Sequence, residues 1–193
     1  MDYEIHVTVD RDGPVRERLP NLRAWFPGLR LHVFDNVIAP GQTKRDHVVT
    51  LSARREDDDA ALKTMEKLVQ HVARTGALIE REKIEVAPWH PTLPLDGAVD
   101  MTHETHMVVW GLQPLAMQSV RVPLTLWSVN ARTSEIVATV RTRGYRKHHV
   151  GTVHSVVHQM LKELHALPIK IDQETVLHDS NPDHDAEWEA SIK

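Results

Sequence analysis

The sequence predicts an α+β protein built from two halves that follow the same order of elements, β-α-β-β-α-β. Three observations predict it. Several short segments alternate apolar and polar residues, which is typical of half-buried strands. Longer segments place apolar residues at helical spacing, which indicates amphipathic helices. A proline-rich stretch, residues 87–97, separates two sets of such segments and marks a boundary between them.

The first half begins with an alternating strand, in which Ile5, Val7 and Val9 share one face and polar residues share the other. Its second helix is expected after Asp57, where consecutive aspartates favour a helix start, and should end near Gly76. The expected strands of this half cover 3–9, 29–34, 47–54 and 78–86, and its other expected helix covers 15–26.

The second half repeats this order, with a weaker signal for its first helix. Its expected strands cover 105–110, 124–129, 135–143 and 169–177, and its expected helices cover 112–120 and 149–164. These elements divide the chain into a first half of residues 1–87, a linker of 88–102, a second half of 103–178 and a C-terminal tail of 179–193.

Short identities between the halves indicate an internal duplication. The matches are Glu4 and His6 with Glu104 and His106 at an offset of 100 residues, and Thr50 and Arg54 with Thr139 and Arg143 at an offset of 89. The whole pattern predicts two tandem ferredoxin-like (βαββαβ) halves, each with an antiparallel sheet that carries its helices on one face. The open faces of the two sheets would line a shared polar groove.

The groove would bring together side chains suited to phosphate chemistry. His6 and His106 lie at matching positions in the two halves, and imidazoles can act as general acid and base near neutral pH. We therefore expect these two histidines to be catalytic. Hydroxyls and cations around them would hold the phosphate of a substrate, and the expected binding residues are Thr8, Thr50, Arg54, Lys83, Thr139 and Arg143.

Two short motifs carry a family resemblance. His6-Val7-Thr8 fits the pattern His-x-Thr/Ser, and His106-Met107-Val108 has the histidine without the hydroxyl. On these residues the sequence resembles the 2H phosphoesterase superfamily, whose members pair two ferredoxin-like lobes with one such motif in each. The resemblance implies a phosphodiesterase-like hydrolase with His6 and His106 as its catalytic pair.

Two other functions fit the same residues. The open sheets could form a non-catalytic module that binds a small anionic ligand or has a regulatory role. Alternatively, Glu4, His6, Glu104 and His106 offer carboxylate and imidazole ligands to a divalent ion, which would make the protein a metal-dependent enzyme. The leading interpretation, an acid–base phosphoesterase, needs neither a metal nor a cofactor.

Composition narrows the function classes. The net charge of -4 argues against duplex DNA as a partner, although the cationic run 141–149 could contact a small phosphorylated molecule or an RNA end. No apolar run reaches the roughly 20 residues of a membrane span. The absence of cysteine excludes disulfide, thiolate-zinc and cysteine-nucleophile chemistry. We expect a cytoplasmic protein that could form homo-oligomers.

Overall fold

The computed structural model describes residues 2–9, 15–27, 30–39, 45–93, 101–112, 122, 124–130 and 133–184. The first half contains β1 (Asp2–Val9), α1 (Val15–Trp25), β2 (Arg30–Ala39), β3 (Arg45–Arg54), α2 (Asp58–Ala73) and β4 (Ile79–Val86). The second half contains β5 (Thr102–Trp110), β6 (Leu126–Asn130), β7 (Ile136–Arg143), α3 (Arg146–Gln159) with its π-helical continuation η2 (Met160–Leu164), and β8 (Leu167–Asp179).

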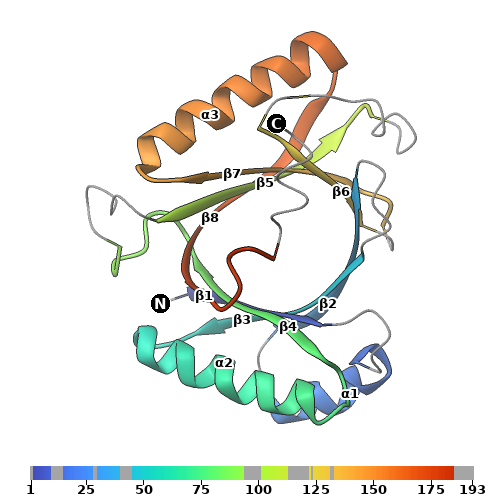
Figure 1. The fold of residues 1–193 in the computed structure, drawn as a ribbon, viewed down its shortest axis with the longest axis vertical. Coiled ribbons are helices and arrows are strands. Elements are labelled where there is room, and N and C mark those ends of the chain that lie inside the picture. Colours follow the sequence, from blue (N-terminus) through green and yellow to red (C-terminus); the bar gives the residue numbers. More distant parts are fainter. Residues whose placement is uncertain are drawn as a thin grey trace.

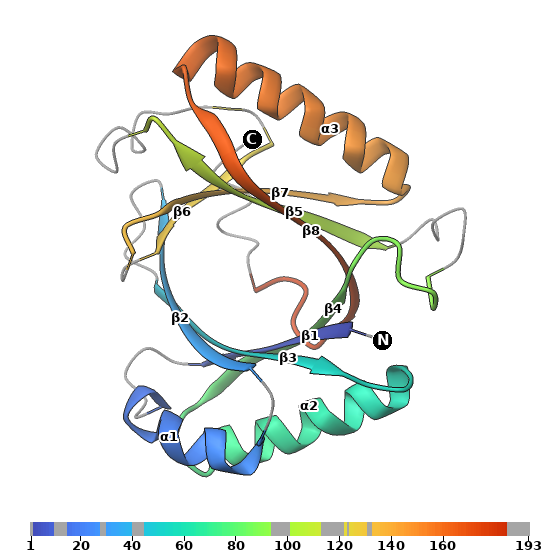
Figure 2. The same ribbon diagram turned by 180° about the vertical axis from the view of Figure 1, so that it is seen from behind.

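The strands form one closed antiparallel barrel in the order β1-β3-β2-β6-β7-β5-β8-β4. Each half contributes four neighbouring strands in an equivalent order, β4-β1-β3-β2 and β8-β5-β7-β6. The halves are joined by the pairs β2–β6 and β4–β8. Figure 1 shows the strands as a ring with α3 outside one wall and α1 and α2 outside the opposite wall, and Figure 2 shows the same arrangement from behind.

The α+β class predicted from the sequence is confirmed, and the two sheets continue into one closed barrel instead of leaving an open groove. Both edge strands of each half pair with an edge strand of the other half, so the open faces of the sheets enclose the interior of the barrel. Pairing removes the unsatisfied backbone N–H and C=O groups that an edge strand exposes, which favours closure over a groove with free edges. The polar residues Glu4 and His6 of β1 and Glu104 and His106 of β5 therefore face inward.

Two apolar cores lie between the barrel wall and the helices. In the first half, Ile5 and Val7 of β1 pack with Leu68 and Val72 of α2, and all four are fully buried. In the second half, the core between α3 and the wall contains Met107, Ala138, Val140, Val153, Val156 and Met160. The strand alternation predicted for residues 3–9 is confirmed, since its apolar face covers the core and its polar face does not.

The helix boundaries of the first half follow the sequence signals. Asp57 caps α2, and its Oδ1 accepts a hydrogen bond from the backbone N–H of Ala60 at 2.8 Å. After α2 the chain passes through Gly76 at a φ of 91°, a left-handed conformation that glycine adopts without strain. The other helix, α1, runs from Val15 to Trp25 and includes Pro20.

Several elements differ from the expectation. β2 extends to Ala39 instead of residue 34, because its far end pairs with β6 of the other half. The expected helix over 112–120 falls almost wholly outside the described residues. In α3 and η2, Val156 is buried and Leu161 is 43% exposed. The π-helical turn changes the angular spacing of the last residues, which a regular 3.6-residue pattern does not anticipate.

Candidate functional site inside the barrel

Acidic and basic side chains from four neighbouring strands, β1, β4, β8 and β5, meet inside the barrel. The register places Glu4 directly opposite Glu85 across β1 and β4, and Glu104 directly opposite Glu174 across β5 and β8. Carboxylates at directly opposed positions repel each other. Cationic groups must therefore lie close to both pairs if the carboxylates are to stay ionised.

His6 is one of these groups. Its Nε2 lies 2.8 Å from Oε2 of Glu85 and 3.7 Å from Oε1 of Glu4. Burial by itself would lower the pKa of His6, but the carboxylate of Glu85 outweighs this effect and raises it. The two carboxylates of its own half therefore favour the cationic form of His6.

His106 has the equivalent position in the second half. Its Nε2 lies 3.4 Å from Oε2 of Glu104 and 3.5 Å from Oε2 of Glu174, and its Nδ1 hydrogen-bonds the Thr139 hydroxyl at 3.0 Å. Burial opposes the charge, but the two carboxylates raise the pKa of His106 to about 10. These contacts favour the imidazolium form of His106 near neutral pH.

Two further cations surround Glu104. Lys83 Nζ lies 2.7 Å from Oε1 of Glu85 and 3.1 Å from Oε2 of Glu104. Arg141 directs both Nε and a terminal nitrogen at Oε1 of Glu104, each at 2.9 Å. Burial alone would raise the carboxylate pKa values, but Lys83 and Arg141 lower the pKa of Glu104, and Lys83 and His6 bring that of Glu85 to about 2. Both carboxylates are ionised at neutral pH.

Glu4 and Glu174 have a different environment. Among the residues that the structure describes, neither lies within ion-pair distance of a lysine or arginine. Burial, together with the charges of Glu85 and Glu4, raises the pKa of Glu174, even though His106 opposes this effect. The Glu4 side chain is 34% exposed, so this side of the cluster is open to solvent. A diffusible cation would compensate these two carboxylates.

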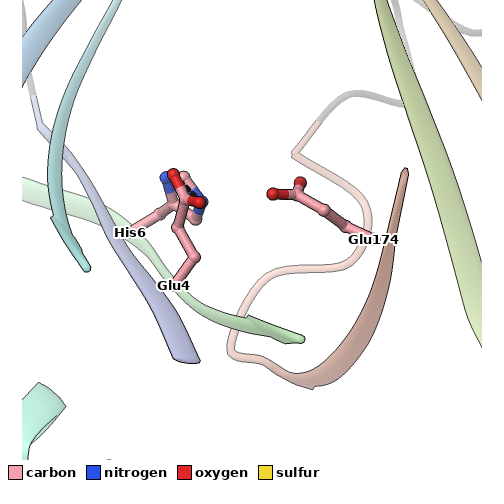
Figure 3. Close-up of side chains that lie close together, drawn as sticks. All are labelled: Glu4, His6 and Glu174. Carbon is pink, nitrogen blue, oxygen red and sulfur yellow. Dashed lines mark ion pairs between the residues drawn. The ribbon is translucent and has the colours of Figure 1, made fainter. Parts of the chain in front are cut away.

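The side chains form two equivalent sets of potential metal ligands. One set is Glu4, His6 and Glu174, and the other is Glu104, His106 and Glu85; within each set the ligand atoms lie within 4.8 Å of one another. Each set combines a Glu-x-His pair from the first strand of one half with a glutamate from the last strand of the other half. In Figure 3, Glu4 and His6 face Glu174 from across the interior.

The predicted site residues divide into those that join this cluster and those that do not. His6, His106, Lys83 and Thr139 are in it. Thr8 is buried two positions after His6 on β1. The sequence predicted both histidines in one groove; in the structure they lie in one cluster, each against its own pair of carboxylates.

The other three predicted residues are Thr50, Arg54 and Arg143. The backbone of Thr50 on β3 is opposite His6, and that of Arg54 is opposite Asp2 at the end of the sheet. The side chains of Thr50 and Arg54 lie outside the described part of the structure. Arg143 is exposed at the end of β7.

The residues that the sequence prediction omitted from the site are mainly acidic. Glu4 and Glu104 were expected only as ligands in the alternative metal-dependent interpretation, Arg141 only within the cationic run 141–149, and Glu85 and Glu174 were not assigned a role. A signal for Glu174 existed, because it follows Glu85 by 89 positions, the same offset that relates Thr50 to Thr139. Applying the repeat to the last strand of each half would have identified it.

The fold and the cluster define an α+β barrel with a charged, His- and Glu-rich interior. Comparison of the sequence with protein-family models and with curated proteins found no match. Among the described residues, no helix is both long and apolar enough to cross a membrane. The function must therefore be inferred from the cluster itself.

Proposed function

We propose that the protein is a divalent-metal-dependent enzyme whose ion binds Glu4, His6 and Glu174 inside the barrel. The observation that carries this proposal is the convergence of one imidazole and two carboxylates from both halves, with ligand atoms within 4.8 Å. Ligands about 2.1 Å from an ion lie roughly 3–4 Å apart, so small movements of these side chains would complete the coordination.

The donor set indicates the kind of ion. Two carboxylates and one imidazole suit Mn²⁺, Fe²⁺ or Zn²⁺, whereas Mg²⁺ prefers oxygen ligands throughout. Three protein ligands leave coordination positions for water or a substrate, which is typical of catalytic metal sites. The partial exposure of Glu4 gives those positions access to solvent.

The proposed substrate is a small phosphorylated molecule, and the reaction is hydrolysis of its ester by a metal-bound water. Without an ion, Glu4 and Glu174 would repel a phosphate at the open side of the cluster, because no lysine or arginine among the described residues pairs with them. A divalent ion there would reverse the charge, polarise a phosphoryl oxygen and lower the pKa of a bound water. The Thr139 hydroxyl, which His106 Nδ1 holds at 3.0 Å, would then donate a hydrogen bond to the substrate.

This proposal changes the roles expected for the two histidines. His6 becomes a metal ligand instead of a general base: the ion would replace the imidazole proton, at a position where two carboxylates favour a cation. His106 holds the Thr139 hydroxyl in position. A phosphoesterase that uses the histidine pair alone stays a prediction, but it needs one neutral imidazole beside these carboxylates.

We also infer that the two halves are duplicated ferredoxin-like units. Three features support this inference: the equivalent strand orders, the Glu-x-His pairs at the same place on β1 and β5, and the glutamates opposite them on β4 and β8. Duplication explains why the barrel contains two similar ligand sets.

Metal binding and hydrolysis test the proposal together. Chelator-treated protein should bind about one equivalent of Mn²⁺ in calorimetric titration and then hydrolyse p-nitrophenyl phosphate or bis(p-nitrophenyl) phosphate. Glu174→Gln should weaken binding by roughly 10–100-fold or more and lower hydrolysis, since it removes a ligand. The control Glu80→Gln changes an exposed glutamate on β4 and should match the wild type. Metal binding without hydrolysis would favour a non-catalytic binding module, and no binding would contradict the proposal.

A further inference from the structure

The second ligand set, Glu85, Glu104 and His106, has the same composition as the first, but a lysine side chain lies between its carboxylates. Its ligand atoms also lie within 4.8 Å of one another. The ammonium of Lys83 lies between its two carboxylates, at 2.7 Å from Glu85 and 3.1 Å from Glu104. The Lys83 side chain is only 10% exposed, so this cation is a fixed part of the interior.

The two halves differ at the positions that supply cations. Lys83 is opposite His6 across β1 and β4, and the residue opposite His106 across β5 and β8 is Asp172. In the same way Arg141 is opposite Glu104, whereas the residue opposite Glu4 on β3 is Ser52. Both cations therefore serve the second set, and the equivalent positions of the other half hold no lysine or arginine.

Charge explains why the two sets should behave differently. Glu104 contacts Arg141 through one oxygen and Lys83 through the other, and Lys83 also contacts one oxygen of Glu85. A divalent ion at this place would meet the ammonium at close range and would be repelled. Glu4 and Glu174 have no lysine or arginine within ion-pair distance among the described residues; the groups that contact them are the imidazoles of His6 and His106.

We infer that Lys83 is the resident cation of a second, latent metal site, and that it restricts the barrel to one divalent ion. The expectation that the wild-type protein binds one ion rests on the proposed function. It also makes a claim of its own, namely that Glu85, Glu104 and His106 can bind a divalent ion once the ammonium is removed. The ligand class is the same as for the first set, a Mn²⁺-like or Zn²⁺-like ion with carboxylate and imidazole ligands.

The test counts bound Mn²⁺ by electron paramagnetic resonance. Wild-type protein should bind one ion, Lys83→Ala should bind two, and Lys83→Arg should bind one because it keeps the charge. Adding Glu104→Gln to Lys83→Ala should weaken the second site by about tenfold or more, since a ligand is lost. A folded Lys83→Ala protein that binds no more Mn²⁺ than the wild type would overturn the inference.

Further variants separate this inference from the proposed function. If wild-type protein binds no ion but Lys83→Ala binds one that depends on Glu104, the proposed function fails and the latent site stands. If the wild type and Lys83→Ala each bind one ion that depends on Glu4, the proposed function stands and the latent site fails. Should Lys83→Ala not fold, Lys83→Gln keeps an N–H donor near the carboxylates and adds an oxygen ligand; it should bind the second ion, and failure to do so would equally overturn the inference.

Discussion

Lys83 of the first half and Glu104 of the second half form a buried ion pair, with 3.1 Å between Nζ and Oε2. Their strands, β4 and β5, are not neighbours, because β8 lies between them. The pair therefore connects the halves across the interior, in addition to the backbone pairing at the barrel wall. Two pairs of opposed glutamates lie in the same cluster: Glu4 with Glu85, and Glu104 with Glu174.

Removing the Lys83 charge should destabilise the apo protein strongly. Lys83→Met leaves Glu85 and Glu104 without the ammonium between them, and breaking a buried ion pair in this way costs about 3–5 kcal/mol. Urea denaturation of chelator-treated protein measures the effect. Lys63→Met, at an exposed position of α2, should change the free energy of unfolding by less than about 0.5 kcal/mol. Equal effects of the two substitutions would contradict the role given to Lys83.

The packing of α2 on the outer wall gives a second prediction. Leu68 is fully buried in the first core, so Leu68→Ala should lower the free energy of unfolding by about 2–5 kcal/mol through lost apolar burial and a cavity. Leu78→Ala is the control, since Leu78 is 68% exposed and should have little effect. Thermal or urea unfolding compares them, and a tolerated Leu68→Ala would mean that α2 does not pack here.

The N-terminal cap of α2 gives a third prediction. Asp57→Ala removes the acceptor of the Ala60 N–H, and the loss of such a cap costs about 1 kcal/mol. Asp57→Asn should retain most of the stability, because its amide oxygen can accept the same bond. If the alanine and asparagine variants were equally destabilised, the loss of charge and not the cap would be responsible.

The Asp57 cap also illustrates what the sequence predicts well. Caps, strand alternation and helix ends depend on residues close together in the chain, so the aspartate run and Gly76 were sufficient to bound α2. The polar face of β1 was likewise predictable, because Glu4 and His6 alternate with Ile5 and Val7. Local patterns do not report which distant edges will pair.

Closure of the barrel and the charge of its interior could not be predicted in this way. The pairs β2–β6 and β4–β8 join strands far apart in the sequence, and closure turned an expected groove into an enclosed site. His106 was expected to titrate near neutral pH, but its contacts with Glu104 and Glu174 raise its pKa to about 10. Those contacts depend on the register of β5 and β8, which only the tertiary structure defines.

A pH dependence follows from His149, which lies away from the proposed metal ligands. Its Nε2 hydrogen-bonds Thr105 at 2.7 Å and its Nδ1 hydrogen-bonds Thr142 at 2.9 Å. Burial, with a smaller effect of His103, lowers the pKa of His149 from 6.5 to about 4. The unfolded chain therefore takes up this proton at a higher pH than the folded protein does. Neutral His149 contributes fully to the free energy of unfolding above pH 6.5. This contribution falls, by up to about 3 kcal/mol, as the pH decreases towards 4.

Urea denaturation between pH 7 and pH 4 measures this dependence. His149→Gln should have a smaller loss of stability over that range, since glutamine does not titrate and can still hydrogen-bond the two hydroxyls. His103 and other titrating groups are present in both proteins, so the difference between the curves isolates His149. Parallel curves for the two proteins would contradict the lowered pKa.

The most direct test of the proposed metal site is a crystal structure with Mn²⁺ and an anomalous difference map. The account predicts one strong peak inside the barrel, within about 2.0–2.3 Å of Glu4, His6 and Glu174, and none between Glu85 and Glu104, where Lys83 lies. A map with no interior peak, or with its only peak on the outside of the barrel at His154 and His158 of α3, would contradict it.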